Sequence, residues 1–325
     1  MREDDTMGDL GTPQRFLDLA KQSRGPQVLS EEGLRERFGE LAEIEIDAGQ
    51  VWRACWDEVS VLVLVLAVED RDVLVAPVTI EPPAEDDRCM VLEGSFTAFG
   101  VAATVWAGLT CLVPIRVLDR PIDQWSEDLI RWTTHTAQGR PHPVPPGTRQ
   151  GQPIQSELDP AALLQAELAD DLESLSQAPG LPVDTPGSTP RDLASLLGTS
   201  LDLASLCSSL GLPQSEVMKL LRGKTPLTPD QVEVVARVTG LASEKIAGTV
   251  RRLPLGLVIQ AEHPRWRPTW ARRAQRLHIS EDQARLTGSY GVFALAARET
   301  GGSESDWEQR LRQFLRGEKT GAGGA

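Results

Sequence analysis

Apolar and β-branched residues gather in short runs over residues 49–138, and polar turns separate these runs. The two longest are "VSVLVLVLAV" at residues 59–68 and "VLVAPVTI" at residues 73–80, joined by the polar residues "EDRD". Two such runs with a short polar connection predict a β-hairpin. Strand-like pieces follow at "RCMVLEG", "AATVWAG" and "CLVPIRVL". This density of short strands predicts a small barrel or a strongly bent sheet, covered on both faces by flanking helices because the runs are continuously apolar.

Helical patterns flank this block on both sides. Residues 1–48 are acidic, with a modest apolar stripe at helical spacing. "RPIDQWSEDLIRWTTHT" predicts a helix leaving the barrel, and an acidic helix is predicted over residues 159–175. Pro- and Gly-rich linkers are predicted on either side of that second helix, at residues 139–153 and at "QAPGLPVDTPGSTP". Residues 139–188 are therefore expected to form two hinges around one helix, so that the two halves of the chain move relative to each other.

The second half of the chain is predicted to be helical to its end, beginning with a domain at residues 189–252. Thr189 and Thr228 each precede a proline, an arrangement typical of a helix N-cap followed by the first helical residue. Gln231 lies three residues after Thr228 and completes a capping box. Gly198 is expected to end the first of these helices.

One stretch of this domain has the spacing of a helix-turn-helix. Such a unit needs a small residue where two helices cross, a glycine that takes positive φ in the turn, and an apolar anchor on the second helix. Cys207, Gly211 and Val217 supply these at separations of four and six residues. The exposed side of the second helix then carries Gln214, Ser215, Met218, Lys219 and Arg222.

These side chains suit the edges of DNA bases. Gln214 can pair with adenine through two hydrogen bonds, Met218 can pack on a thymine methyl group, and Lys219 can reach guanine or a phosphate. Lys224 is a further candidate for DNA binding, through phosphate contacts that position the domain. Flanking candidates for phosphate contact are Arg191, Arg251 and Arg252.

The region 189–248 resembles the lambda-repressor-like, XRE-type DNA-binding domain. The resemblance covers "TPRDLASLLG", "LDLASLCSSLG", "PQSEVMKLLRG", "TPDQVEVVARVTG" and "ASEKIAG", which match the five helices of that family in order. It implies binding to double-stranded DNA. We expect a homodimer, because one such helix rarely makes enough specific contacts alone.

A weaker resemblance links residues 50–120 to the MazF/PemK family of toxin ribonucleases, which are small SH3-like barrels. It is carried by "GQVWRA" and "LVAPVTI", and it implies that Thr79 occupies the catalytic threonine position. The family also uses an arginine before its second strand, where this chain has "DEVSVLVLVL". Without that cation the charge that develops on the phosphate lacks a stabilising group. We therefore expect no enzymatic activity, and a barrel that senses a ligand or binds a partner protein instead.

Charge is divided unevenly along a chain whose formal net charge is -14. Residues 1–185 carry a net charge of -19 and residues 186–325 one of +5. The acidic half could repel DNA or bind a protein partner, while the second half attracts a polyanion mildly.

Residues 253–325 are expected to form a basic helical extension that opens with "RWRPTWARRAQRLH". One interpretation is accessory contact with nucleic acid. A second is an amphipathic helix with Trp270, Ala274 and Leu277 packed inward. A third is docking of this basic segment on the acidic half of the same chain, which would mask DNA binding.

Four well-separated cysteines and four histidines lack metal-ligand spacing, so we expect free thiols and neither a metal site nor a cofactor. The acidic start has no secretory signal and the longest apolar run is too short to span a membrane, so a cytoplasmic location is expected. The predicted fold is α+β and multidomain. The favoured function is a sequence-specific DNA-binding transcriptional regulator, which could be antitoxin-like. The alternatives are a toxin-like RNA endonuclease or its inactive descendant, and a protein-interaction scaffold.

Overall fold

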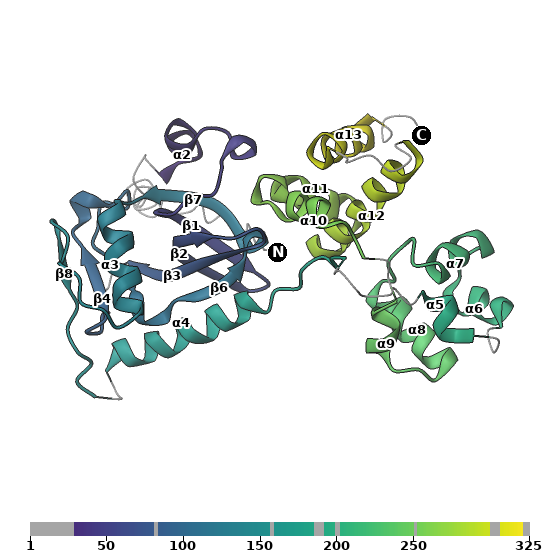
Figure 1. Ribbon diagram of the computed structural model, residues 1–325, viewed down its shortest axis with the longest axis horizontal. Coiled ribbons are helices and arrows are strands. Elements are labelled where there is room, and N and C mark those ends of the chain that lie inside the picture. Colours follow the sequence, from purple (N-terminus) through teal and green to yellow (C-terminus); the bar gives the residue numbers. More distant parts are fainter. Residues whose placement is uncertain are drawn as a thin grey trace, which may run out of the picture.

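The computed structural model describes residues 29–80, 84–156, 159–184, 192–198, 202–249, 252–299 and 306–320. These residues form three bodies (Figure 1), of which the sheet body has two apolar cores and each helical body has one. The sheet body comprises residues 29–178, the five-helix body residues 192–249, and the C-terminal body residues 181–184 with 252–320. Residues 1–28, which hold most of the predicted N-terminal helical segment, lie outside the described residues.

The sheet body is built on one antiparallel sheet in the order β7-β1-β2-β3-β5-β4-β8, with β6 paired to β3 beside β5. Strand β3 changes partner along its length, because Asp72–Val75 pair with β6 and Val78–Ile80 pair with β5. The strands are β1 (Gln50–Trp56), β2 (Val59–Val68), β3 (Asp72–Ile80), β4 (Cys89–Leu92), β5 (Ala103–Trp106), β6 (Cys111–Pro114), β7 (Leu118–Gln124) and β8 (Thr148–Gln150).

Alternate residues of the central strands enter two different cores, one on each face of the sheet. On β2, Val63 and Val65 pack on the face covered by α4 (Pro160–Ser176), while Leu64 and Leu66 pack on the face covered by α3 (Glu127–Ala137). All four side chains are at most 7% exposed. The expectation of strands buried on both faces by flanking helices is confirmed. The remaining helix of this body is α2 (Glu31–Phe38), which is capped by the Ser30 hydroxyl.

Two predicted boundaries in this body are wrong. The predicted helix at "RPIDQWSEDLIRWTTHT" begins later, because "RPIDQ" belongs to β7 and pairs with β1. The predicted linker at residues 139–153 contains β8, which adds to the edge of the sheet by pairing with β4. Strand pairing satisfies backbone groups that an irregular linker would leave to water, which is why both segments join the sheet.

The acidic helix predicted at residues 159–175 is present as α4, but it does not stand between two hinges. Leu168, Leu172 and Leu175 are at most 5% exposed and belong to the core on one face of the sheet. The sheet body therefore extends to Ala178, which also packs in that core.

The five-helix body consists of short helices in the order that the sequence predicts. They are α5 (Leu193–Leu197), α6 (Leu203–Leu210), α7 (Gln214–Leu221), α8 (Pro229–Thr239) and α9 (Ser243–Ala247). The predicted capping box of Thr228 and Gln231 is confirmed at α8, and Gly198 ends α5 with φ 60°. The N-cap of α5 is Asp192, whose carboxylate accepts a hydrogen bond from Ser195 N at 2.7 Å. Thr189, the predicted cap, lies outside the described residues.

The C-terminal body contains four helices and receives one extended segment from the chain before α5. Its helices are α10 (Leu255–Glu262), α11 (Arg267–Leu277), α12 (Glu281–Glu299) and α13 (Trp307–Thr320). Trp270 and Ala274 pack inward as predicted, whereas Leu277 is 44% exposed, contrary to that prediction. Val183 and Leu253 form a parallel bridge, in which Asp184 N donates to Leu253 O at 2.8 Å.

The C-terminal body docks on the sheet body through arginines. Arg71, in the turn between β2 and β3, donates two hydrogen bonds of 2.9 Å to the Glu262 carboxylate, which is 1% exposed. Arg267 donates to the carbonyl oxygens of Val117 and Cys55, at 2.8 and 2.9 Å. Arg265 pairs with Glu45 of the acidic half at 2.7 Å. Part of the basic segment thus contacts the acidic half of its own chain.

Candidate nucleic-acid interface

The connection between α6 and α7 depends on Gly211. This glycine has φ 63° and ψ 25°, the left-handed conformation that the sequence required of it. Gly211 N donates to Ser208 O at 3.3 Å and Leu212 N donates to Cys207 O at 3.2 Å. This pair of hydrogen bonds is a Schellman motif, which satisfies the last carbonyl groups of α6. The chain then turns sharply enough for α7 to start three residues later.

A second Schellman motif ends α7. Gly223 has φ 61°, Gly223 N donates to Leu220 O, and Lys224 N donates to Lys219 O, both at 2.9 Å. At the start of α7, Pro213 is the N-cap. The carbonyl of Pro213 accepts from Glu216 N and Val217 N, so the proline still begins the helix without a missing donor.

One side of α7 anchors the helix in the core. Val217 is fully buried, and Leu220 and Leu221 are 5% and 1% exposed. Cys207 is half-buried and packs against the same core, as a small apolar residue at a helix crossing should. Met218 is also half-buried and packs against it, so its side chain is shared between the core and the surface.

The opposite side of α7 is polar and open to solvent. Its exposed residues are Gln214, Ser215, Lys219 and Arg222, followed by Lys224 just after the helix. We call these five residues and Met218 the α7 face. Lys219 is not free on this face, because its Nζ atom lies 2.6 Å from Glu216 Oε1. That pair is about half exposed on both sides, so water and salt screen it and it is weak.

The five-helix body is not basic as a whole. Residues 192–249 contain five Lys and Arg against six Asp and Glu. Three of the five cations are Lys219, Arg222 and Lys224, so the positive charge is concentrated at α7. Of the other predicted phosphate contacts, Arg252 is exposed, while Arg191 and Arg251 lie outside the described residues. Any attraction for a polyanion must therefore be local to the α7 face.

Thr79, the residue that the ribonuclease resemblance points to, lies near the end of β3 and is half-buried. Its hydroxyl oxygen accepts a hydrogen bond of 3.0 Å from the indole Nε1 of Trp106, which is fully buried. A buried indole N–H needs such an acceptor, and this gives Thr79 a structural role in the sheet body.

The cysteines are free, and Cys89 is the most buried of them. Burial, reinforced by a hydrogen bond with Asp86, raises the pKa of Cys89 well above its usual value. Within the described ranges, no three His, Cys, Asp or Glu side chains are arranged to hold a metal ion. None of the helices described is both long and apolar enough to cross a membrane.

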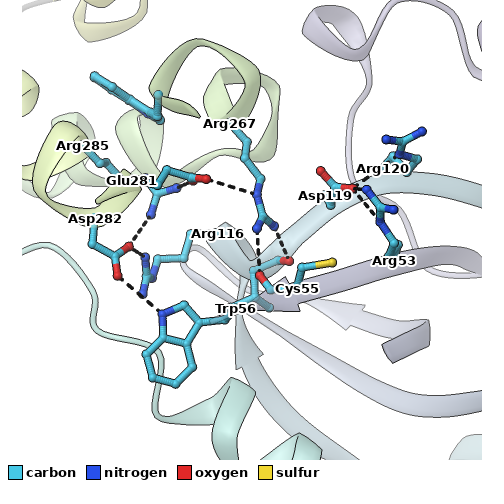
Figure 2. Close-up of polar contacts among 12 residues, drawn as sticks. Arg53, Cys55, Trp56, Arg116, Asp119, Arg120, Arg267, Glu281, Asp282 and Arg285 are labelled. Carbon is cyan, nitrogen blue, oxygen red and sulfur yellow. Dashed lines mark hydrogen bonds and ion pairs between the residues drawn. The ribbon is translucent and has the colours of Figure 1, made fainter. Parts of the chain in front are cut away.

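Sequence reasoning missed one polar cluster at the junction of the three bodies. Arg116 from the sheet body and Arg285 from α12 both contact Asp282, and each arginine side chain is only 3% exposed (Figure 2). The signal was present in "CLVPIRVL", where Arg116 is the lone charge in an apolar run. Its partner is 166 residues away, which no local pattern reveals.

No protein-family model matches the chain and no curated protein is similar to it, so its function has to be inferred from its own residues.

Proposed function

We propose that this chain is a sequence-specific DNA-binding regulator of transcription, and that its five-helix body is an XRE-type helix-turn-helix domain. In this proposal α7 enters the major groove, and the protein acts as a homodimer on two half-sites. Gln214 and Lys219 contact base edges, while Arg222 and Lys224 contact phosphates.

The observation that carries this proposal is the division of α7 into two sides. Val217 and Leu221 hold the helix against a core of its own, and Gln214, Ser215 and Lys219 project from the other side. Such a helix gains little in stability from its exposed polar residues, whereas a helix that reads DNA requires them. The left-handed Gly211 supports the proposal further, because it lets α6 and α7 meet at a sharp turn.

The low net charge of the five-helix body affects how it would bind DNA. With few cations available, non-specific affinity should be weak, and specificity should depend more on base contacts than on phosphates. Glu216 also lowers the non-specific affinity, because its carboxylate pairs with Lys219 when DNA is absent. We infer a regulator that scans DNA weakly and binds firmly only at its own sites.

The sheet body is proposed to be a non-catalytic SH3-like module. The change of partner of β3 from β6 to β5, and the irregular register of β1 with β7, are typical of a strongly bent sheet. The role of Thr79 as acceptor for Trp106 supports a module that does not cleave RNA.

An unbiased selection from random duplex DNA, with the full chain, tests this function. We expect enrichment of one sequence with two half-sites. The Gln214→Ala, Lys219→Ala double variant should bind that sequence at least about tenfold more weakly, because each good base contact contributes about 1–3 kcal/mol.

Lys245→Ala is the matched control, since Lys245 is an exposed lysine of the same body on α9. It should leave the affinity within about twofold, as for a screened surface charge. Circular dichroism confirms that each variant is folded. A selection that enriches no sequence, or a double variant that binds as well as Lys245→Ala, would overturn the proposal.

A further inference from the structure

A cavity of about 680 Å³ lies where the three bodies meet. Its walls come from residues 179–181, from the connection between α7 and α8 with the start of α8, from α9, and from the start of α12. The sheet body contributes Arg116. We call it the junction cavity. Its volume falls in the range of about 300–1,000 Å³ that small-molecule sites occupy.

Apolar groups supply most of the exposed surface of this wall, and five of its lining residues are charged. The larger apolar side chains are those of Leu181, Leu227, Val232 and Leu286. An apolar wall with few polar groups is the usual composition of a site that binds a small organic molecule. The charged groups then determine which molecule fits.

Two of those charged groups are buried arginines with donors to spare. Arg116 and Arg285 line the cavity, and their side chains are each 3% exposed. Arg116 Nε and Nη2, and Arg285 Nε, have no hydrogen-bond partner among the described residues. A buried donor without a partner loses its hydration and gains nothing in return, so it favours a ligand that can accept.

The local charges do not balance. Three guanidinium groups, of Arg116, Arg267 and Arg285, face two carboxylates, of Glu281 and Asp282 (Figure 2). Asp282 is already occupied on both oxygens, since Oδ1 accepts from the two buried arginines and Oδ2 accepts from Trp56 Nε1 at 3.4 Å. These five groups together carry one net positive charge, while Glu233 and Glu244 place negative charge elsewhere on the cavity wall.

The unfilled edge of Arg116 has the geometry that binds a carboxylate elsewhere in this protein. Arg71 uses its own Nε and Nη2 atoms to hold both oxygens of Glu262. Arg116 uses Nη1 for Asp282, while the donors of its Nε–Nη2 edge are buried and have no hydrogen-bond partner among the described residues. An oxyanion that presents two oxygens side by side, such as a carboxylate or a sulfonate, matches this edge through two parallel hydrogen bonds.

We propose that the junction cavity binds a small organic monoanion with an apolar body, whose oxyanion group pairs with Arg116 while the apolar body lies against Leu227, Val232 and Leu286. Glu233 and Glu244 also line the cavity and are exposed, so they repel a ligand with a second negative charge. The bound molecule contacts all three bodies and so restricts their relative motion.

This site does not depend on the proposed DNA binding. The cavity and its arginines are defined by contacts outside the α7 face, so a binding test can succeed or fail whether or not the protein reads DNA. The same two arginines also line a second cavity of about 440 Å³ beside Cys55 and Trp56. Val232 lines only the larger of the two, which lets a variant tell them apart.

The test uses two fluorescent probes with the full chain. Anilinonaphthalene sulfonate is an aromatic monoanion, and phenylnaphthylamine is its neutral counterpart. We expect one sulfonate probe per chain, with an affinity at least about tenfold above that of the neutral probe, as for a charge-assisted pair. Hydrogen exchange should slow at residues 226–233 and 282–287 when the sulfonate is bound.

Val232→Trp and Val238→Trp form a matched pair on α8, since Val238 lies outside the junction cavity. Val232→Trp should fill the cavity and weaken sulfonate binding at least about tenfold, whereas Val238→Trp should change it less than about twofold. Arg116→Lys keeps the positive charge but loses the two-donor edge, so it should weaken the sulfonate probe and leave the neutral probe unchanged.

Three results would overturn the proposal. They are equal affinity for the two probes, equal behaviour of the two tryptophan variants, and binding that does not saturate at one probe per chain. If Arg116→Lys does not fold, the tryptophan pair alone decides, because neither of its positions belongs to the arginine cluster.

Discussion

His263 shows how one residue can make the docking of two bodies depend on pH. Its Nδ1 atom accepts hydrogen bonds from Arg265 N and Arg265 Nε, at 3.2 and 3.0 Å. Protonation at Nδ1 would break both contacts and place a second cation beside Arg265. Burial, together with this arginine, lowers the pKa of His263 to about 4. The Glu45 carboxylate lies 4.0 Å from His263 Nε2.

Because of this lowered pKa, the folded chain loses stability as the pH falls. Below pH 6.5 the unfolded chain binds a proton at His263, whereas the folded chain does not until about pH 4. Stability is therefore complete above pH 6.5 and is lost progressively between 6.5 and about 4. At about pH 5 we expect His263 alone to lower the free energy of unfolding by about 2 kcal/mol.

His263→Gln should remove this loss, because the amide oxygen still accepts from Arg265 and does not titrate. Urea unfolding followed by tryptophan fluorescence, at about pH 7.5 and about pH 5, measures it. His278→Asn is the control, since His278 is exposed and distant from the docked arginines. A wild-type chain that loses no more stability at the lower pH than His263→Gln contradicts the prediction.

Single residues were predictable where their role is local. The positive φ of Gly211, the burial of Val217 and the capping box of Thr228 each follow from a few neighbouring residues. Arg116 was not predictable, because its role depends on Asp282 far along the chain. Sequence spacing determines conformation within one turn, but it contains no distances between segments that meet only in the folded protein.

At the scale of elements, the sequence predicted the strands and helices with strong periodicity and missed those without it. The hairpin of β2 and β3 and the order of α5 to α9 follow from apolar spacing. Strand β8 has three residues and no apolar pattern, and it exists because the edge of β4 offers partners for its backbone. Helix α4 was predicted as a helix, but its attachment to the sheet required knowledge of the opposite surface.

Substitution of Gly211 tests whether its left-handed conformation determines the stability of α6 and α7. A Cβ atom at this position would meet no atom within 4 Å, so substitution introduces backbone strain alone. Gly211→Ala should destabilise the helix pair by about 1–2 kcal/mol. Amide hydrogen exchange of α6 and α7 should become roughly 5- to 30-fold faster.

Gly248→Ala is the matched control in the same body, because Gly248 has an ordinary φ of -72° and its added Cβ would make only normal contacts. We expect that variant to be neutral or slightly stabilising. If the two alanine variants exchange at the same rate, the left-handed turn does not determine the stability of α6 and α7.

At the scale of the whole molecule, the acidic and basic halves of the chain meet through a few buried contacts. The carboxylate of Glu262 is held by two hydrogen bonds from Arg71 and one of 2.6 Å from Leu181 N. A Cβ atom on Gly180 would lie 2.6 Å from Arg71 Nη2, so the glycine leaves room for the arginine. The contact joins the sheet body, the connecting segment and α10.

Arg71→Met should therefore destabilise the chain strongly, by about 3–5 kcal/mol, because it leaves a buried carboxylate without its cation. Combining it with Glu262→Gln should recover more than half of that loss, since the amide oxygen still accepts from Leu181 N. Denaturant unfolding of the three variants measures this. Arg131→Met, which removes an exposed pair with Glu127, should change stability by less than about 1 kcal/mol. An Arg71→Met variant as stable as Arg131→Met contradicts the prediction.

The parallel bridge between Val183 and Leu253 has a consequence for how this protein could have been assembled. The chain leaves the C-terminal body at Asp184 and returns at Leu253, and the two points are hydrogen-bonded to each other. The five-helix body is thus an inserted domain. It interrupts the C-terminal body between two points of the chain that are hydrogen-bonded to each other. The C-terminal body should keep its core when the inserted domain is exchanged for another domain or for a short loop. The protein can in this way acquire a new target without rebuilding the rest of its fold.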